Sequence, residues 1–218
     1  ATADGSGNWS FDHTGTTLAD GSYAITAAAT DASGNTSSTS SALNITVDTA
    51  APAAPAVTAI TDDTGTASDG ITSDNQLIIA GTAEANASVE VFIDAGSIGT
   101  ATADGSGNWS FDHTSTTLAD GSYAITAAAT DASGNTSATS SALNITVDTA
   151  APSAPTVAAI TDDTGTASDG ITSDNQLIIT GTAEANASVE VFIDAGSIGT
   201  ATADGSGNWS FDHTGTTL

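Results

Sequence analysis

Carboxylates are the charged groups that this sequence offers for chemistry. The chain of 218 residues has 26 Asp and Glu residues, three His and no Lys or Arg, so its formal net charge is −26. Carboxylates held close together repel one another, and solvent screening relieves only part of that repulsion. Because no basic side chain can pair with these acids, we expect a bound cation to compensate for their charge.

The donor types select the cation. Asp, Glu, Asn and backbone carbonyls supply the hard oxygen ligands that Ca²⁺ prefers. The scarcity of His and the absence of Cys argue against zinc or copper. The Asp spacing and closing Glu of an EF-hand loop are also missing. The sequence therefore predicts calcium held by loops of another kind.

One long loop is the first candidate for such a site. Residues 62–74 read DDTGTASDGITSD and lie between two predicted strands. A loop of this length needs something to order it. Asp62, Asp63 and Asp69 are its predicted calcium ligands.

The elements that position these acids come from a tandem repeat. Residues 1–100 and 101–200 align without a gap and differ at only six positions. A period of 100 is too long for a solenoid unit and matches a whole small domain. All four prolines follow the sequence VDTAAP or lie within it, at Pro52 and Pro55 and again at Pro152 and Pro155, and predict stiff, extended linkers. The expected domains are the back half of one repeat (1–50), a complete repeat (51–150) and the front two-thirds of a third (151–218).

The complete repeat is predicted to be an immunoglobulin-like Greek-key β-sandwich of about seven strands, and the chain as a whole to be all-β. Apolar residues alternate with polar ones, with turn signals about every ten residues, and no helical period occurs. The sequence LADGSY, which ends at Tyr123, is similar to a tyrosine corner, although Tyr123 could also be a plain core aromatic. Trp9, Trp109 and Trp209 are expected in the core. The predicted strands are residues 56–61, 76–83, 88–94, 98–103, 108–112, 122–130 and 142–148.

This topology predicts which acids meet at a domain junction. If the strands alternate in direction, Asp148 at the end of the last strand faces Glu184 in a turn of the next repeat. One repeat earlier, Asp48 faces Glu84 and Asp131. We therefore expect Ca²⁺ at the junction as well as in the long loop. The full set of predicted ligands is Asp48, Asp62, Asp63, Asp69, Glu84, Asp131, Asp148, Asp162, Asp163, Asp169 and Glu184.

A simpler interpretation competes with the metal sites. The sequences DG, DDTG and DASG are ordinary turns, in which Asp makes local hydrogen bonds and Gly supplies positive φ. We prefer that interpretation for Asp94, Asp104 and Asp120, and both interpretations stay open for the predicted ligands.

Composition also excludes several partners. A chain without basic residues cannot bind nucleic acid or an anionic membrane surface through its own charge. No stretch has the length of a membrane span and no signal peptide is visible, so we expect no membrane insertion. The chain starts in mid-repeat, so any targeting segment is expected outside it. Its expected partners are neighbouring repeats.

Together, the motifs VDTAAP, GTAEANASVEVF, GTATADGSGNWSF and LADGSYAITAAATDASGNTS resemble the bacterial Ig-like repeats of giant Ca²⁺-dependent adhesins exported by type I secretion. The resemblance covers the whole chain. It implies an extracellular extender at the bacterial cell surface, in which many repeats hold a distal adhesion tip away from the cell and Ca²⁺ stiffens the junctions. The resemblance does not identify the ligand of that tip.

Two other functions stay open, and a third is disfavoured. The chain could be a subunit of a self-assembling fibre that associates head to tail, because its two ends are complementary parts of one sandwich. Near-identical copies could also bind a glycan or receptor weakly, with avidity. Catalysis is not expected: strand alternation places His113 on the opposite face from Ser110 and Asp112, which prevents a relay.

Overall fold

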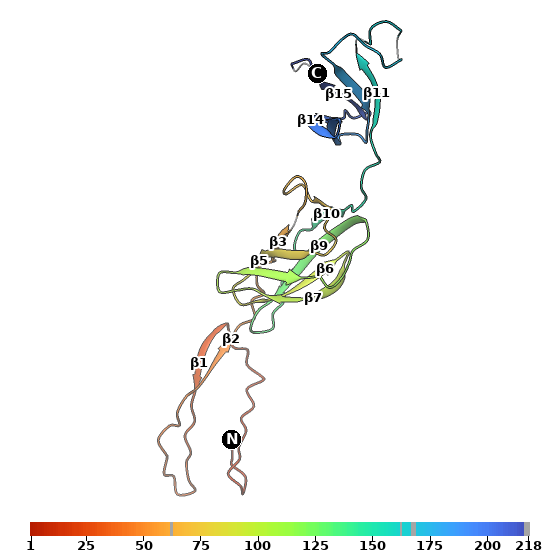
Figure 1. Ribbon diagram of the computed structural model, residues 1–218. Helices are drawn as coiled ribbons and strands as arrows, with labels where there is room; N and C mark the ends of the chain where they lie inside the picture. Colours follow the sequence, from red (N-terminus) through yellow and green to blue (C-terminus); the bar gives the residue numbers. More distant parts are fainter. Residues whose placement is uncertain (62, 162, 167–168, 216–218) are drawn as a thin grey trace. The chain divides into compact units, whose positions relative to one another are not determined.

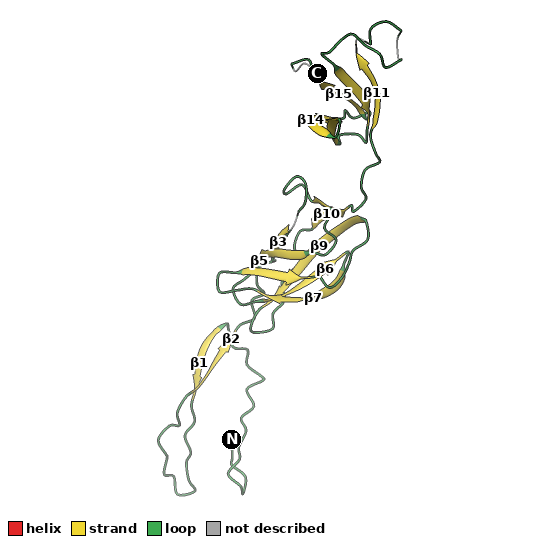
Figure 2. Ribbon diagram, viewed as in Figure 1, coloured by secondary structure: helices red, strands yellow, loops and turns green. Residues whose placement is uncertain are grey.

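The computed structural model describes residues 1–61, 63–161, 163–166 and 169–215. All regular structure among these residues is β-strand, which confirms the predicted all-β class (Figure 2). The described part of the chain contains no helix long and apolar enough to cross a membrane. The chain divides into two compact units, Ala1–Thr149 and Ala150–Leu218.

The complete repeat in the first unit is a sandwich of two sheets (Figure 1). One sheet has the strand order β3-β5-β8, and the other has the order β4-β10-β9-β6-β7. All neighbouring strands are antiparallel except β4 and β10, which are parallel. The strands are β3 (Ala56–Ile60), β4 (Ile71–Thr72), β5 (Ile78–Thr82), β6 (Ser88–Ile93), β7 (Gly96–Thr102), β8 (Asn108–Asp112), β9 (Gly121–Thr130) and β10 (Leu143–Val147).

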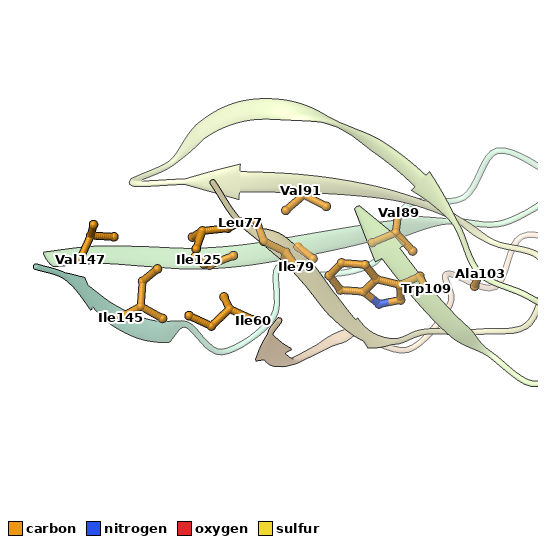
Figure 3. Packing of buried hydrophobic residues seen from close by; sticks show 11 residues of the cluster. Ile60, Leu77, Ile79, Val89, Val91, Ala103, Trp109, Ile125, Ile145 and Val147 are labelled. Carbon is orange, nitrogen blue, oxygen red and sulfur yellow. The ribbon is translucent and has the colours of Figure 1, made fainter. Parts of the chain in front are cut away.

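Residues from both sheets fill the core between them (Figure 3). In β6, Val89 and Val91 are fully buried while Glu90 between them is exposed. In β9, Ile125 and Ala127 are likewise fully buried. Burying such alternating apolar side chains removes hydrocarbon surface from water, which is the main force that holds the two sheets together.

Trp109 packs where a neighbouring strand has no side chain. Trp109 in β8 is 3% exposed and lies opposite Gly81 in β5. A Cβ atom at Gly81 would collide with the carbonyl oxygen of Ala56 and with the Trp109 ring. The indole therefore occupies space that only glycine leaves open, and its predicted place in the core is confirmed.

The predicted strands of the complete repeat are confirmed within one or two residues at their ends, and one further strand, β4, is present. Asp94 and Ala95 both have positive φ and form a tight turn between β6 and β7, which lets β7 start earlier than predicted. The two-residue strand β4 was expected to be loop. It pairs with the end of β10, and the buried Thr72 lies within it.

The tyrosine corner is confirmed in both copies. The hydroxyl of Tyr123, in β9, donates to the carbonyl oxygen of Ala119 over 2.8 Å. In the first repeat the hydroxyl of Tyr23 donates to Ala19 in the same way, over 2.7 Å. The bond of Tyr23 forms without a complete sandwich around it. The corner is therefore a local property of the LADGSY sequence.

The first fifty residues form one hairpin and several turns. Strand β1 (Gly21–Ile25) pairs with β2 (Leu43–Val47), the equivalents of β9 and β10. Residues 8–12 have the sequence of β8 but form no strand. Trp9 is 57% exposed, so the expectation that it is a core residue is wrong. The strand that would cover it, an equivalent of β5, is missing from this segment.

The second unit contains the equivalents of β3, β5, β6, β7 and β8. One sheet has the order β11-β12-β15, and the other pairs β13 with β14. Its core is smaller and centres on Val189, Val191 and Trp209, which is 3% exposed as expected. The strands are β11 (Thr156–Thr161), β12 (Ile178–Thr182), β13 (Ser188–Ile193), β14 (Gly196–Thr202) and β15 (Asn208–Asp212).

The repeat supplies a matched test of the corner. We expect Tyr123→Phe to lower the free energy of unfolding of the complete repeat by about 1 kcal/mol, because one hydrogen bond is lost at unchanged shape. Tyr23→Phe removes the same bond outside the complete sandwich and should leave that transition unchanged. Urea unfolding followed by tryptophan fluorescence measures both. Equal effects of the two substitutions would contradict the assignment.

Candidate junction and cation site

The linker between the first two repeats is tied to the repeat that precedes it. The backbone amide and hydroxyl of Thr49 both donate to Oδ1 of Asp20, over 3.1 and 2.8 Å. Thr149 makes the same pair of bonds to Asp120, over 3.0 and 2.8 Å. Each Asp belongs to the turn before the tyrosine-corner strand. The chain that leaves the last strand of a repeat is therefore held against that repeat.

The preceding residue of the same linker binds the following repeat. The hydroxyl of Ser133 donates to Oδ2 of Asp48 over 3.2 Å, and Nδ2 of Asn135 donates to the carbonyl oxygen of Asp48 over 3.1 Å. Both donors lie in the loop between β9 and β10. We name Asp48, Asp131, Ser133 and Asn135 the junction cluster.

The junction cluster is organised by Asp131. Its Oδ1 accepts the backbone amides of Ser133 and Asn135 over 2.8 and 2.9 Å, and its Oδ2 accepts Nδ2 of Asn135 over 2.8 Å. Asp31 makes the same three bonds in the first repeat. Since the loop has the same form in both places, it is preorganised before it meets Asp48.

These bonds favour the ionised carboxylate. The side-chain amide of Asn135 is the main cause that lowers the pKa of Asp131 below its ordinary value of 3.8, and backbone amides of the loop add to it against the opposing effect of desolvation. Hydrogen bonds to a charged form stabilise that form. The lowered pKa keeps Asp131 ionised to a lower pH than an ordinary Asp, in the same junction cluster as Asp48.

The long loop between β3 and β5 is ordered in part by hydroxyl groups. The amide of Ser73 donates to Oγ1 of Thr64 over 2.6 Å, and Thr64 and Thr72 lie within hydrogen-bond distance of each other. The backbone amide of Thr146, in β10, donates to the carbonyl oxygen of Gly70 over 2.7 Å. The loop therefore lies beside the end of β10, at the same pole of the sandwich as Asp148.

Asp63 is the residue of this loop that best fits a cation. Its Oδ2 accepts the amide of Ser68 over 2.6 Å, whereas its Oδ1 is buried without a hydrogen-bond partner. A buried carboxylate oxygen without a partner carries a large desolvation cost. An oxygen-preferring cation would offset that cost, so the donor chemistry of the loop fits Ca²⁺.

The other predicted ligands lie at separate places. Asp69 caps a turn by accepting the amide of Ile71, and Glu84 lies exposed in the turn between β5 and β6. In the second unit, Asp169 repeats the turn of Asp69, Asp163 lies in the corresponding loop, and Glu184 is exposed between β12 and β13. Among the described residues, no three or more acidic or histidine side chains are grouped so that they could hold a metal. Two predicted ligands, Asp62 and Asp162, lie outside the described residues.

The acids interpreted as turn residues behave in two ways. Asp104 accepts the amides of Ser106 and Asn108, which confirms a local turn. Asp94 instead accepts the amide of Ala124 in β9, and Asp120 holds Thr149, so both fix segments about thirty residues away in sequence. Sequence reasoning missed this role because a DG or DA turn gives no signal of a distant partner.

The serine, asparagine and threonine at the junction were missed as well. Ser133, Asn135 and Thr49 are common turn residues, and nothing in their spacing marks them as contacts between repeats. The available signal was position: Thr49 directly follows the predicted ligand Asp48, as Thr149 follows Asp148, and the SGN sequence begins two residues after the predicted ligand Asp131.

Ser110, Asp112 and His113 are arranged as strand alternation predicts. Ser110 and Asp112 are exposed, whereas His113 is 9% exposed and lies beside Phe111, with ring centroids 6.1 Å apart and the rings tilted by 31°. Asp112 accepts both the amide and the hydroxyl of Thr114. The three side chains do not share a face.

The charge state of Asp131 gives a testable prediction. Its pKa should lie below 3.8 in the folded chain and rise toward that value in Asn135→Ala, because the largest stabilising bond is lost. Asn108→Ala, which alters the corresponding turn of Asp104, should leave Asp131 unchanged. Carboxyl NMR titration measures both.

The lowered pKa of Asp131 also determines how the stability of the fold depends on pH. The folded pKa lies below the unfolded one, so ionised Asp131 stabilises the fold above the ordinary pKa, and this contribution is lost as pH falls through the folded value. A pKa of Asp131 that does not respond to Asn135→Ala would contradict the account.

Comparison with known proteins places these features in a family. A family profile described as bacterial Ig-like domain matches residues 1–49, 51–149 and 151–217. A search of curated protein sequences finds no match.

Two solved structures illustrate the structural comparison. One is described as a tetra-tandem repeat in the extending region of a large adhesion protein; it is 25% identical, with 90% of this chain and 49% of that chain covered and a TM-score of 0.37. Another comprises fibronectin(III)-like modules of CbhA from Clostridium thermocellum; it is 21% identical, with 60% and 64% covered and a TM-score of 0.35. The chain thus spans less than two thirds of either structure. On the family match over nearly its whole length, the chain belongs to the bacterial Ig-like domain family.

Proposed function

We propose that this chain is an extender segment of a secreted bacterial surface adhesin, and that Ca²⁺ stiffens it at the domain junctions and in the long loops. One observation carries the mechanical part of the proposal. Two consecutive linker residues bind opposite repeats: Thr49 binds Asp20 behind it, and Asp48 binds Ser133 and Asn135 ahead of it. A linker held on both sides transmits orientation from one repeat to the next.

The composition of the linker supports the same role. Pro52 and Pro55 are both buried, and proline fixes φ without offering a backbone donor. Only eight residues separate the end of β2 at Val47 from the start of β3 at Ala56. A short, proline-containing segment with both prolines packed is a semi-rigid spacer rather than a flexible tether.

The negative net charge of the chain supports the proposal that Ca²⁺ binds at the junctions and in the long loops. Asp48 and Asp131 lie in one junction cluster, and their negative charges repel each other with no basic side chain in the chain to offset them. Bound Ca²⁺ would supply positive charge and take oxygen ligands. In the long loop, Asp63 would give its unpartnered Oδ1, and Asp62 and Asp69 would be the other ligands from the same loop. At the junctions, the ligands would be Asp48, Glu84, Asp131, Asp148 and Glu184.

The surface location is part of the same proposal. Near-identical repeats of one small sandwich give length without adding a new site at each step, which suits a stalk that holds a binding tip at a distance. An all-acidic surface keeps such an array soluble and separate from nucleic acid and anionic lipid.

Small-angle X-ray scattering of the full chain tests the calcium proposal. We expect a larger maximum dimension and a narrower distance distribution in millimolar Ca²⁺ than in chelator, because neutralised junctions bend less. Asp48→Ala should reduce this difference. Asp104→Ala removes an acid of equal charge that is not a predicted calcium ligand, and it should preserve the difference. A scattering curve that is the same with and without Ca²⁺ would rule out stiffening by calcium.

A further inference from the structure

The chain enters and leaves the complete repeat at opposite ends of β9. The incoming linker contacts this repeat through Asp48, which accepts the hydroxyl of Ser133 in the loop that follows β9. The outgoing linker is held at the other end, where Thr149 donates to Asp120 immediately before β9 begins. Tension along the chain therefore acts along the direction of β9, over the ten residues of that strand.

The first and last strands of the repeat both lie along this load. Strand β3 starts at Ala56, opposite Thr82, and the turn after Thr82 leads to β6, whose first residue pairs with the last residue of β9. The start of β3 is therefore at the entry end. Strand β10 finishes at Val147, opposite Gly121, the first residue of β9. Because hydrogen bonds in a sheet run across the strands, tension loads the bonds of β3 and β10 in shear, and many must break together.

Strand β10 is held on both of its edges, and the long loop supplies one of the two partners. One edge pairs with β9 over five residue pairs, and the other edge pairs with β4. The amide of Thr146 donates to the carbonyl oxygen of Gly70 over 2.7 Å. The amide of Asp148 donates to the carbonyl oxygen of Thr72 over 2.9 Å. These bonds lie where β10 passes into the outgoing linker, and we name residues 70–72 the clamp segment.

Two features of the long loop bring the clamp segment against β10. Gly70 has a φ of 76°, and a Cβ atom there would lie 3.0 Å from the carbonyl oxygen of Asn144 in β10, so glycine allows this close approach. Thr72 is 1% exposed, and its Oγ1 accepts the amide of Asp74 over 2.9 Å. The same Oγ1 lies 3.3 Å from Oγ1 of Thr64. A glycine and a pair of buried or half-buried hydroxyl groups thus position the segment.

We propose that the clamp segment is a force-bearing site: it holds β10 in shear and sets the rate at which the repeat unfolds under tension along the chain. Forced unfolding is governed by the unfolding rate rather than by equilibrium stability. Bonds that must break before β10 can move therefore decide the resistance. The inference rests on the proposed extender role in that an extender carries tension, but its bonds are made by backbone amides and hydroxyl groups and do not require calcium.

This site predicts a resistance that depends on the direction of the load. Ala85, in the turn between β5 and β6, and Ala132, in the loop after β9, are exposed residues at the entry end. Pulling these two residues apart unzips β6 from β9 one pair at a time, starting at Ser88 and Thr130. The clamp segment lies at the exit end, so this transverse load does not reach it first.

Single-molecule unfolding of the full chain at constant force, in the presence of chelator, tests the proposal. The chain has no cysteine, so introduced thiols give defined attachment points. Ala53→Cys with Ala151→Cys applies axial load across the complete repeat alone, and both residues are exposed. Ala85→Cys with Ala132→Cys applies transverse load. At equal force, unfolding should be slower under axial load. Equal or faster axial unfolding would overturn the proposal, and the chelator separates that failure from a failure of stiffening by calcium.

Thr72→Val tests whether the clamp segment is the cause. The substitution keeps the shape of the side chain and removes the hydroxyl that positions the segment, so the axial unfolding rate should rise about fivefold, as expected for one lost hydrogen bond. The transverse rate should stay unchanged, because β6 and β9 separate first. Thr114→Val is the matched control: it removes a hydroxyl bond to Asp112 after β8, a strand that carries neither end of the repeat, and should change neither rate.

Gly70→Ala tests the same contact without removing a hydroxyl. The added methyl group would crowd the carbonyl oxygen of Asn144 and push the segment away from β10, so the axial rate alone should rise. Acceleration of the same size under both loads would mean that the two substitutions only lower the stability of the fold. That result, or an axial rate that neither substitution changes, would overturn the assignment of the force-bearing site.

Discussion

The position of β9 between β6 and β10 is the interaction on which the rest of this structure depends. It closes the core, because Ile125 and Ala127 are fully buried only in this arrangement. It begins at the tyrosine corner and ends in the loop that carries Ser133 and Asn135. One strand thus connects the interior of a repeat to the contact with its neighbour. Where the equivalent of β6 is missing, as at residues 21–30, the strand is half as long.

The carboxylates work within this frame mainly as acceptors for backbone amides and hydroxyl groups. Asp131 shapes the loop, Asp120 holds the departing linker and Asp94 holds β9. In a chain without Lys or Arg, these hydrogen bonds replace the ion pairs that fix loops in other proteins. They leave the net charge in place, and that remaining charge is the physical reason to expect a cation at the junctions.

The sequence was sufficient to predict the sandwich, its long strands and the tyrosine corner, because alternation and the repeat are strong local signals. It was not sufficient to predict β4. This strand has only two residues, and it forms because they pair with β10. At the junction it correctly brought Asp48 to the loop of Asp131. It did not predict that Ser133 and Asn135 make the contacts, since hydroxyl and amide partners depend on the folded geometry. The exposure of Trp9 shows the same limit: identical residues are core or surface according to which strands surround them.

A crystal structure of this chain grown in millimolar Ca²⁺, with anomalous scattering to identify the ions, tests the account most directly. The account predicts calcium with carboxylate and carbonyl oxygens at about 2.3–2.6 Å, beside Asp48 at the junction and at Asp63 in the long loop. Junction acids that point into solvent, with no ion density near Asp48, would contradict it.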